Sequence, residues 1–294
     1  ILFLLFKLET WDEAKVIIAE CYGFAAAICP DSVLPTFKAQ LGSKDTGCKN
    51  FALVALKSCI SQSVNDQGIE EALASTWLPM AMEKLADEDV SVRRSATLLL
   101  SLATHTKLAL VTDLLNDCLP PLLVQTRPDE SLIRIIDLGP FKHKIDDGLE
   151  QRKSAFDCLS ILISKCWDGV PDHAAVVESI AAGVGDEYDV KLRCHDLLVV
   201  LANKEPSLVL GSLDKVIKPM TKTLSKRVKA DGVKQEIDKN DDMLRSCMRA
   251  CLALDKIDGS DNVASFKSFI GAIAGDAFLG PRLVALKKDL QLRD

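Results

Sequence analysis

The chain has 294 residues, of which 48% are hydrophobic and 27% are charged, and this composition excludes an intrinsically disordered protein. Its 36 basic and 42 acidic side chains give a net charge of −6. Phosphate binding needs clustered Lys and Arg, so this balance argues against a nucleic-acid partner. Aromatic residues are only 5%, and most apolar residues are Leu, Ala, Val and Ile, which favours stacked helices over a β-sandwich.

The chain begins at Ile1, without Met, in a short apolar run over residues 1–6. This run is too short to span a bilayer, and it lacks the basic flank of a signal peptide. We interpret it as the cut edge of a helix. The chain is therefore expected to be a fragment of a longer protein, with no membrane contact.

Six helices are predicted along the chain, each with a basic or polar start followed by small and apolar residues. They begin near Lys15, Lys49, Arg94, Lys153, Arg193 and Arg245. A base period of about 40 residues with insertions is typical of two-helix HEAT or armadillo repeats. The pattern predicts an all-α fold: a single α-solenoid of HEAT-like repeats over residues 1–294. An irregular helical bundle is the alternative.

Short acidic turns separate the paired helices, as at residues 86–89 and 185–187. An Asp at such a turn caps the next helix, and a following basic residue can reach the turn of the neighbouring repeat. We expect this arrangement for Asp89 with Arg93, and for Asp189 with Arg193.

The first long interval between repeats contains an insertion over residues 131–148. Residues 132–138 are mostly apolar and β-branched, and Gly139-Pro140 is a turn signal. The next residues alternate with the period of a strand: Phe141, Lys142, His143, Lys144 and Ile145. The insertion therefore predicts one β-hairpin projecting from the helical solenoid.

The second insertion, residues 226–240, precedes the last repeat. It contains five basic and three acidic residues. One interpretation is a solvated loop, and the other is a charged contact surface.

No constellation of an enzyme is present. The phosphate-binding glycine loops and the G-x-S-x-G motif are absent, and the ten cysteines form no C-x-x-C pair. Cys194, His195 and Asp196 are consecutive, but adjacent helical residues do not face one another, so a packed or surface histidine is favoured. We expect no catalysis, cofactor or metal, and buried thiols in a reducing compartment.

Several segments resemble one known family. The run Leu-Gly-Pro-Phe-Lys-His at 138–143, with residues 132–134 and 146–149, resembles the C-terminal HEAT repeats of the cullin-associated, neddylation-dissociated (CAND) proteins. Residues 233–236 and 245–250 resemble the last repeat of that family, and residues 19–35 match it near the start. The resemblance is colinear over essentially the whole chain, which then corresponds to the C-terminal quarter or so of a member.

In that family the solenoid wraps around a cullin, and a hairpin occupies the cullin surface to which the substrate-receptor adaptor binds. The resemblance implies a non-enzymatic, cullin-binding scaffold that competes with adaptors and promotes their exchange on cullin–RING ubiquitin ligases. It also implies regulation of neddylation and of SCF assembly. A monomer in cytoplasm and nucleus is expected. The alternative is a HEAT-repeat adaptor of another class, such as a transport receptor or a phosphatase scaffold.

The resemblance assigns partner contact to residues of both insertions. Apolar residues of the hairpin would be buried against the partner, and its basic residues would orient the hairpin on the partner's surface. The alternative is that the hairpin packs on its own solenoid and staples two repeats. The expected contact residues are Ile133, Arg134, Ile135, Ile136, Leu138, Gly139, Pro140, Phe141, Lys142, His143, Lys144, Lys234 and Gln235.

Overall fold

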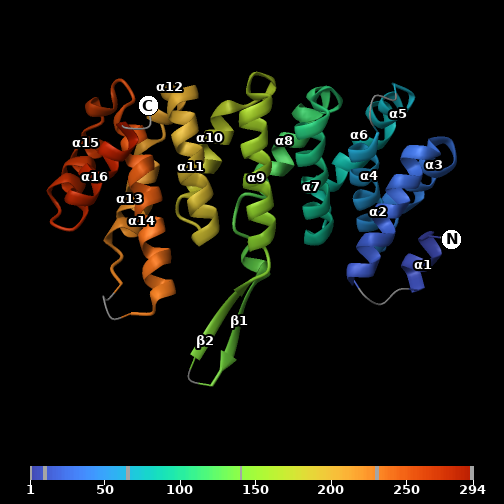
Figure 1. The fold of residues 1–294 in the computed structure, drawn as a ribbon, viewed down its shortest axis with the longest axis horizontal. Helices are drawn as coiled ribbons and strands as arrows, with labels where there is room; N and C mark the ends of the chain where they lie inside the picture. Colours follow the sequence, from blue (N-terminus) through green and yellow to red (C-terminus); the bar gives the residue numbers. More distant parts are fainter. Residues whose placement is uncertain (1, 9–11, 64–66, 140, 229–231, 292–294) are drawn as a thin grey trace. The chain divides into compact units, whose positions relative to one another are not determined.

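The computed structural model describes residues 2–8, 12–63, 67–139, 141–228 and 232–291. These residues divide into two compact units, Ile1–Asp172 and His173–Asp294. Each unit is a stack of paired helices (Figure 1), which confirms the predicted all-α solenoid of HEAT-like repeats. One two-stranded sheet is present in the described part of the chain.

The first unit consists of a helical stack with one hairpin between its last two long helices. The helices and strands are α1 (Leu2–Leu8), α2 (Asp12–Ile28), α3 (Pro30–Leu41), α4 (Thr46–Gln62), α5 (Gln67–Ala72), α6 (Leu78–Met82), α7 (Val90–Thr106), α8 (Leu115–Val124), β1 (Ile133–Leu138), β2 (Phe141–Asp146) and α9 (Leu149–Lys165). A π-helical turn over Leu73–Trp77 joins α5 to α6.

The second unit contains helices joined by turns and loops, with no strand among its described residues. Its helices are α10 (His173–Gly183), α11 (Tyr188–Lys204), α12 (Pro206–Leu210), α13 (Leu213–Ser225), α14 (Lys234–Asp255), α15 (Ala264–Gly275) and α16 (Leu279–Gln291).

The long helices of each unit pack directly against one another. In the first unit α2 contacts α4, α4 contacts α7, and α7 contacts α9, and in the second α11 contacts α14. Each of the six repeat helices predicted from the sequence falls within one of these elements. Phe51, Leu53 and Leu56 of α4 are almost fully buried because α4 has neighbours on two sides. Burial of each such side chain stabilises the fold by about 1.5–3 kcal/mol. The packing of α4 against a helix on either side thus contributes to the stability of the first unit.

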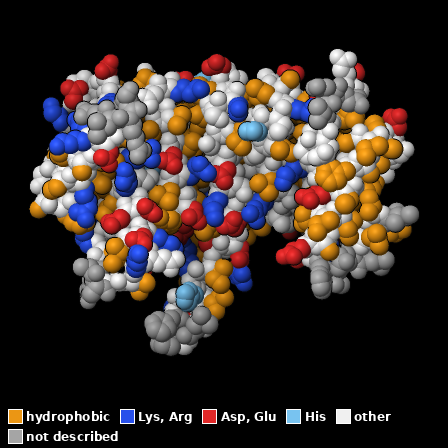
Figure 2. All heavy atoms as spheres, viewed as in Figure 1, with side chains coloured by type: hydrophobic (Ala, Val, Ile, Leu, Met, Phe, Trp, Pro, Cys, Tyr) orange, Lys and Arg blue, Asp and Glu red, His pale blue; other side chains and the backbone are white. Residues whose placement is uncertain are grey.

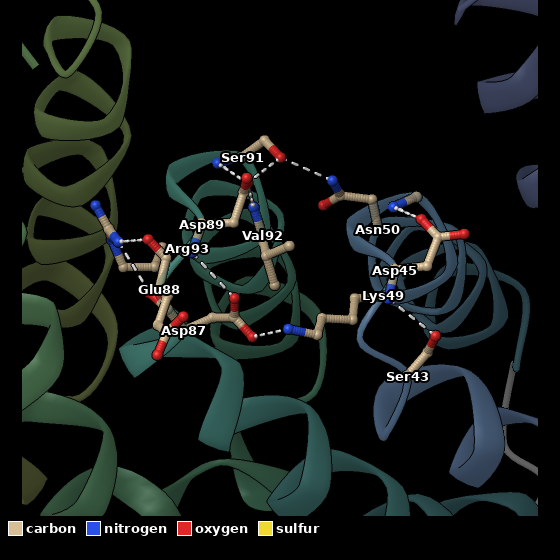
Figure 3. Close-up of polar contacts among 11 residues, drawn as sticks. Ser43, Asp45, Lys49, Asn50, Asp87, Glu88, Asp89, Ser91, Val92 and Arg93 are labelled. Carbon is tan, nitrogen blue, oxygen red and sulfur yellow. Dashed lines mark hydrogen bonds and ion pairs between the residues drawn. The ribbon is translucent and has the colours of Figure 1, made fainter.

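Aspartates cap two of the long helices, α4 and α7, at the joints between repeats (Figure 3). Asp45 Oδ1 accepts a hydrogen bond from the Gly47 amide at 2.8 Å, and Asp89 Oδ1 accepts one from the Ser91 amide at 2.8 Å. The predicted cap at Asp89 is therefore confirmed. The predicted cap at Asp189 is wrong, because α11 already begins at Tyr188 and Asp189 lies inside its first turn.

A lysine links one repeat to the turn of the next. Lys49 Nζ of α4 donates to Asp87 Oδ2 at 2.7 Å, in the turn that precedes α7 (Figure 3). Burial favours the neutral form of Asp87, but the hydrogen bond and charge of Lys49 outweigh it and lower the pKa of this carboxyl. Arg93 stays in its own turn, where its Nη1 donates to the carbonyl oxygens of Asp87 and Glu88 at 2.9 Å. The link between repeats thus comes from the preceding helix.

Replacing Asp89 by alanine should lower the free energy of unfolding by about 1 kcal/mol, the usual cost of losing an N-cap. Its hydrogen bonds with Ser91 and Val92 lower the pKa of Asp89 below the ordinary 3.8. The contribution is therefore present above that pH and is lost as the pH falls through the folded-state pKa. Urea unfolding of Glu88→Ala, an exposed residue of the same turn, is the control. An equal loss in both variants would contradict the capping role.

Candidate partner-binding hairpin

The hairpin projects from the N-terminal end of α9 (Figure 1). Its strands pair antiparallel, from Ile133 opposite Asp146 to Leu138 opposite Phe141. Gly139 has φ +66°, a backbone conformation that glycine adopts without strain and that two-residue hairpin turns require. The predicted β-hairpin is confirmed. Pro140, the other predicted turn residue, lies outside the described residues.

The strand register distributes the predicted contact residues over two faces, because successive side chains of a strand point to opposite sides. Ile133 and Ile135 share one face, and Ile136 lies on the other, opposite His143. The side chain of Ile135 is 69% exposed, and those of Ile136 and Ile145 are each 37% exposed. The hairpin therefore presents apolar surface on both faces.

Charged residues alternate with these isoleucines. Ile135 pairs with Lys144, and Asp137 pairs with Lys142, so one face carries both signs of charge. Lys142, His143 and Lys144 are exposed. Asp137 and Ile145 are missing from the contact residues expected from the sequence. The pairing of Ile145 with Arg134 places Ile145 on the same face as Ile136. Leu138 and Phe141 form the last backbone pair, and their side chains lie outside the described part.

A buried ion pair holds the base of the hairpin to α9. Arg152 donates from Nη2 to Asp146 Oδ2 at 2.8 Å and from Nη1 to Asp146 Oδ1 at 3.1 Å. The side chains are only 2% and 8% exposed. The hydrogen bonds from Arg152 lower the pKa of Asp146 and keep its carboxylate charged. The Gly148 amide also donates to Asp146 Oδ1 at 3.1 Å, so strand, turn and helix meet at one carboxylate.

A second pair lies next to the first on the solvent side. Arg134 donates from Nε to Asp147 Oδ2 at 2.7 Å and from Nη2 to Asp147 Oδ1 at 2.9 Å. These bonds lower the pKa of Asp147. Both side chains are exposed, so the pair orients the base of the hairpin but contributes little to the stability of the fold. Arg134, which was expected to contact a partner, thus binds Asp147 at the base of the hairpin. The adjacent Asp146 and Asp147 thus each pair with a different arginine.

The remaining expected contact residues belong to the second unit. Lys234 and Gln235 form the first turn of α14 and are both exposed. The structure therefore gathers the hairpin residues in one element and places these two in the other unit. It also makes residues 234–240 helical, so the loop interpretation is wrong for that half of the second insertion.

The consecutive residues Cys194, His195 and Asp196 do not form a catalytic arrangement. His195 is fully buried, with Nδ1 3.3 Å from Ser246 Oγ. Burial raises the pKa of the Cys194 thiol well above its ordinary value, so the thiol stays protonated. Asp196 is exposed instead, with Oδ1 3.8 Å from Arg249 Nη1.

The ten cysteines are free thiols, and most of them are buried as expected. Cys21 and Cys29 are exposed and depart from that expectation. Among the described residues, no group of three or more His, Cys, Asp or Glu side chains could hold a metal ion. No single described helix is long and apolar enough to cross a membrane, although α15 and α16, a pair bent by 99°, meet the length and composition test together.

Comparisons with known proteins identify the family. Residues 110–274 match the TIP120 family, described as TATA-binding protein interacting (TIP20). The chain is 39% identical over 276 residues to the Arabidopsis thaliana cullin-associated NEDD8-dissociated protein 1, covering 92% of this chain and 22% of that protein. It is 31% identical to the Emericella nidulans cullin-associated NEDD8-dissociated protein 1, C-terminal part, covering 78% of this chain and 22% of that protein.

The fold also has a counterpart among solved structures. The crystal structure of an engineered protein superposes with a TM-score of 0.52 at 16% identity, covering 88% of this chain and 98% of that chain. This likeness concerns the fold alone. The chain spans about a fifth of the length of the curated relatives it matches. It belongs to the TIP120 family and fits the C-terminal region of the cullin-associated NEDD8-dissociated proteins.

Proposed function

We propose that this chain is a non-enzymatic scaffold that binds a cullin of a cullin–RING ubiquitin ligase and competes there with the substrate-receptor adaptor. The names of the relatives support the cullin as partner. The observation that carries the competition is the hairpin, which exposes Ile135, Ile136 and Ile145 on a base held by the buried pair of Arg152 and Asp146.

The hairpin has the physical properties of a competing element. Burying an exposed isoleucine in a partner contributes about 1.5–3 kcal/mol at most, so a few such residues suffice for a specific contact. A preformed hairpin loses little conformational freedom on binding, which preserves that energy as affinity. An adaptor that needs the same surface is then excluded sterically.

Competition also explains exchange. A scaffold that occupies the adaptor-binding surface leaves the cullin without its previous adaptor. When the scaffold dissociates, a different adaptor can bind. We expect the scaffold to act as a monomer in cytoplasm and nucleus. The rest of a longer chain would add affinity by engaging a second region of the same cullin.

Size-exclusion chromatography of this chain with a cullin–RING complex tests the proposal. We expect co-elution without adaptor and loss of co-elution with saturating adaptor. Ile135→Asp/Ile136→Asp should weaken the competition at least about tenfold, a loss of about 1.4 kcal/mol. Val200→Asp, at an exposed apolar position of the second unit, is the matched control.

Two outcomes would contradict the proposal in different ways. If the hairpin variant still competes as the unaltered chain does, the hairpin does not exclude the adaptor. If the chain ignores cullins and instead retains transport factors or phosphatase subunits, it is a HEAT adaptor of another class.

A further inference from the structure

A groove in the second unit is lined by four lysines. It opens between the start of α11, the end of α13 and the start of α14, and its volume is about 840 Å³. Basic and acidic side chains are interspersed over α13 and α14 in Figure 2. Three of the lysines lie in different helices, Lys191 in α11, Lys222 in α13 and Lys239 in α14, and Lys226 follows the end of α13.

None of the four lysines forms an ion pair with a described residue, although Lys239 Nζ lies 5.9 Å from the centre of the Tyr188 ring. Lys191 is half-buried, and burial together with the like charges of Lys222 and Lys226 lowers its pKa, against the attraction of Glu187 and Asp186. Burying an ammonium group beside two others is unfavourable without a counter-charge. An anion bound in the groove would relieve both the desolvation and the repulsion.

An unpaired hydroxyl lies in the wall of the same groove. Thr223 lines the groove and is only 7% exposed. Its Oγ1 has no hydrogen-bond partner among the described residues. A buried polar group without a partner costs about 1–3 kcal/mol, so such groups are rare in folded proteins. In the conformation shown this oxygen faces away from solvent, and a turn about χ1 would bring the hydroxyl into the groove, where it can donate a hydrogen bond to a carboxylate oxygen.

The remaining lining residues decide which anion fits. Glu187, Asp189 and Glu236 also face the groove and would repel a compact polyphosphate. Tyr188 and Met243 add apolar surface between the charges. A peptide with separated carboxylates and an apolar side chain matches this mixture.

We propose that this groove binds an acidic peptide segment of a protein partner, with one carboxylate beside Lys191 and Thr223. The groove belongs to a different unit from the hairpin, and its occupation requires no role for the hairpin. The proposal gives the charged residues of the second insertion a ligand, because Lys226 and Lys239 lie within that insertion.

Fluorescence anisotropy with the 294-residue chain tests the groove without any cullin. The probe is a labelled peptide in which Glu residues alternate with Leu and Ser, and its control is the same peptide with Gln in place of Glu. We expect the acidic peptide alone to bind, with an affinity that falls as salt is added. Lys222→Gln/Lys226→Gln should weaken binding about tenfold, whereas Lys218→Gln/Lys267→Gln, at exposed positions outside the groove, should leave it unchanged.

A variant of Thr223 separates binding from folding. Thr223→Val removes the unpaired hydroxyl at nearly constant shape, so thermal unfolding should move to an equal or higher temperature while peptide binding weakens. Equal binding of the Gln peptide, or unchanged binding by Lys222→Gln/Lys226→Gln, would overturn the proposal. Tighter binding of tripolyphosphate than of the acidic peptide would assign the groove to a phosphate ligand and would also overturn it.

Discussion

Replacing Arg152 by alanine should lower the free energy of unfolding of the first unit by about 3–5 kcal/mol, because the variant leaves the carboxylate of Asp146 buried without its partner. The pair is bidentate, and Arg152 is among the largest fully buried side chains of the chain. Urea unfolding gives the free energy. Hydrogen exchange of the amides of β1 and β2 should show that the hairpin base opens first.

The loss should depend on pH in a defined direction. In the unaltered chain Arg152 lowers the pKa of Asp146 below 3.8, so the pair stabilises the fold above that pH and loses its effect as the pH falls through the folded-state pKa. In Arg152→Ala, burial without a partner raises the pKa of Asp146, and the carboxyl becomes neutral at a higher pH. The difference between the two proteins should therefore be constant near neutrality and shrink as the pH approaches and passes below 3.8.

The neighbouring exposed pair provides the control. Arg134→Ala removes the same kind of bidentate bond from Asp147, but at the surface, where solvent screens the charges and such a pair contributes little to stability. Equal losses in Arg134→Ala and Arg152→Ala would mean that burial of the inner pair does not set its energy. The double variant Arg152→Met/Asp146→Leu should recover most of the stability, since no buried charge remains unpaired.

Replacing Gly23 by alanine should destabilise the packing of α2 on α4 by about 1–3 kcal/mol, the usual cost of inserting atoms into a filled interface. A Cβ at Gly23 would lie 2.2 Å from the Ala55 carbonyl oxygen and 2.7 Å from Ser58 Cβ. Backbone atoms cannot yield as a flexible side chain can, so the two helices must move apart. This clash outweighs the roughly 1 kcal/mol by which alanine favours a helix over glycine.

Gly271 in α15 is a control with the opposite expected sign. A Cβ there would meet nothing within 4 Å. Gly271→Ala should therefore stabilise the chain by about 0.5–1 kcal/mol through helix propensity alone. Thermal unfolding of both variants measures the contrast. An unchanged or higher unfolding temperature for Gly23→Ala would show that close approach of α2 and α4 does not require glycine.

Much of the fold is predictable because its signals are local. The apolar period of the helices, the cap at Asp89 and the turn at Gly139 each depend on a few neighbouring residues. Helix boundaries are harder to predict from the sequence: α14 begins at Lys234 rather than near Arg245. Residues 234–240 carry mostly charged side chains with little apolar period, so nothing in the local pattern indicated a helix there.

The sequence by itself determined the helical repeats, the hairpin and the resemblance to the family, because periodicity, turn chemistry and colinear motifs are all readable along the chain. Only the tertiary structure decided that Arg152 holds Asp146, that Ile135 lies opposite Lys144, and that Lys191 and Thr223 share a groove with α14. These relations depend on strand register and on how separate helices pack. Such packing depends on many contacts between residues that are far apart in the sequence, so it cannot be predicted from any short segment.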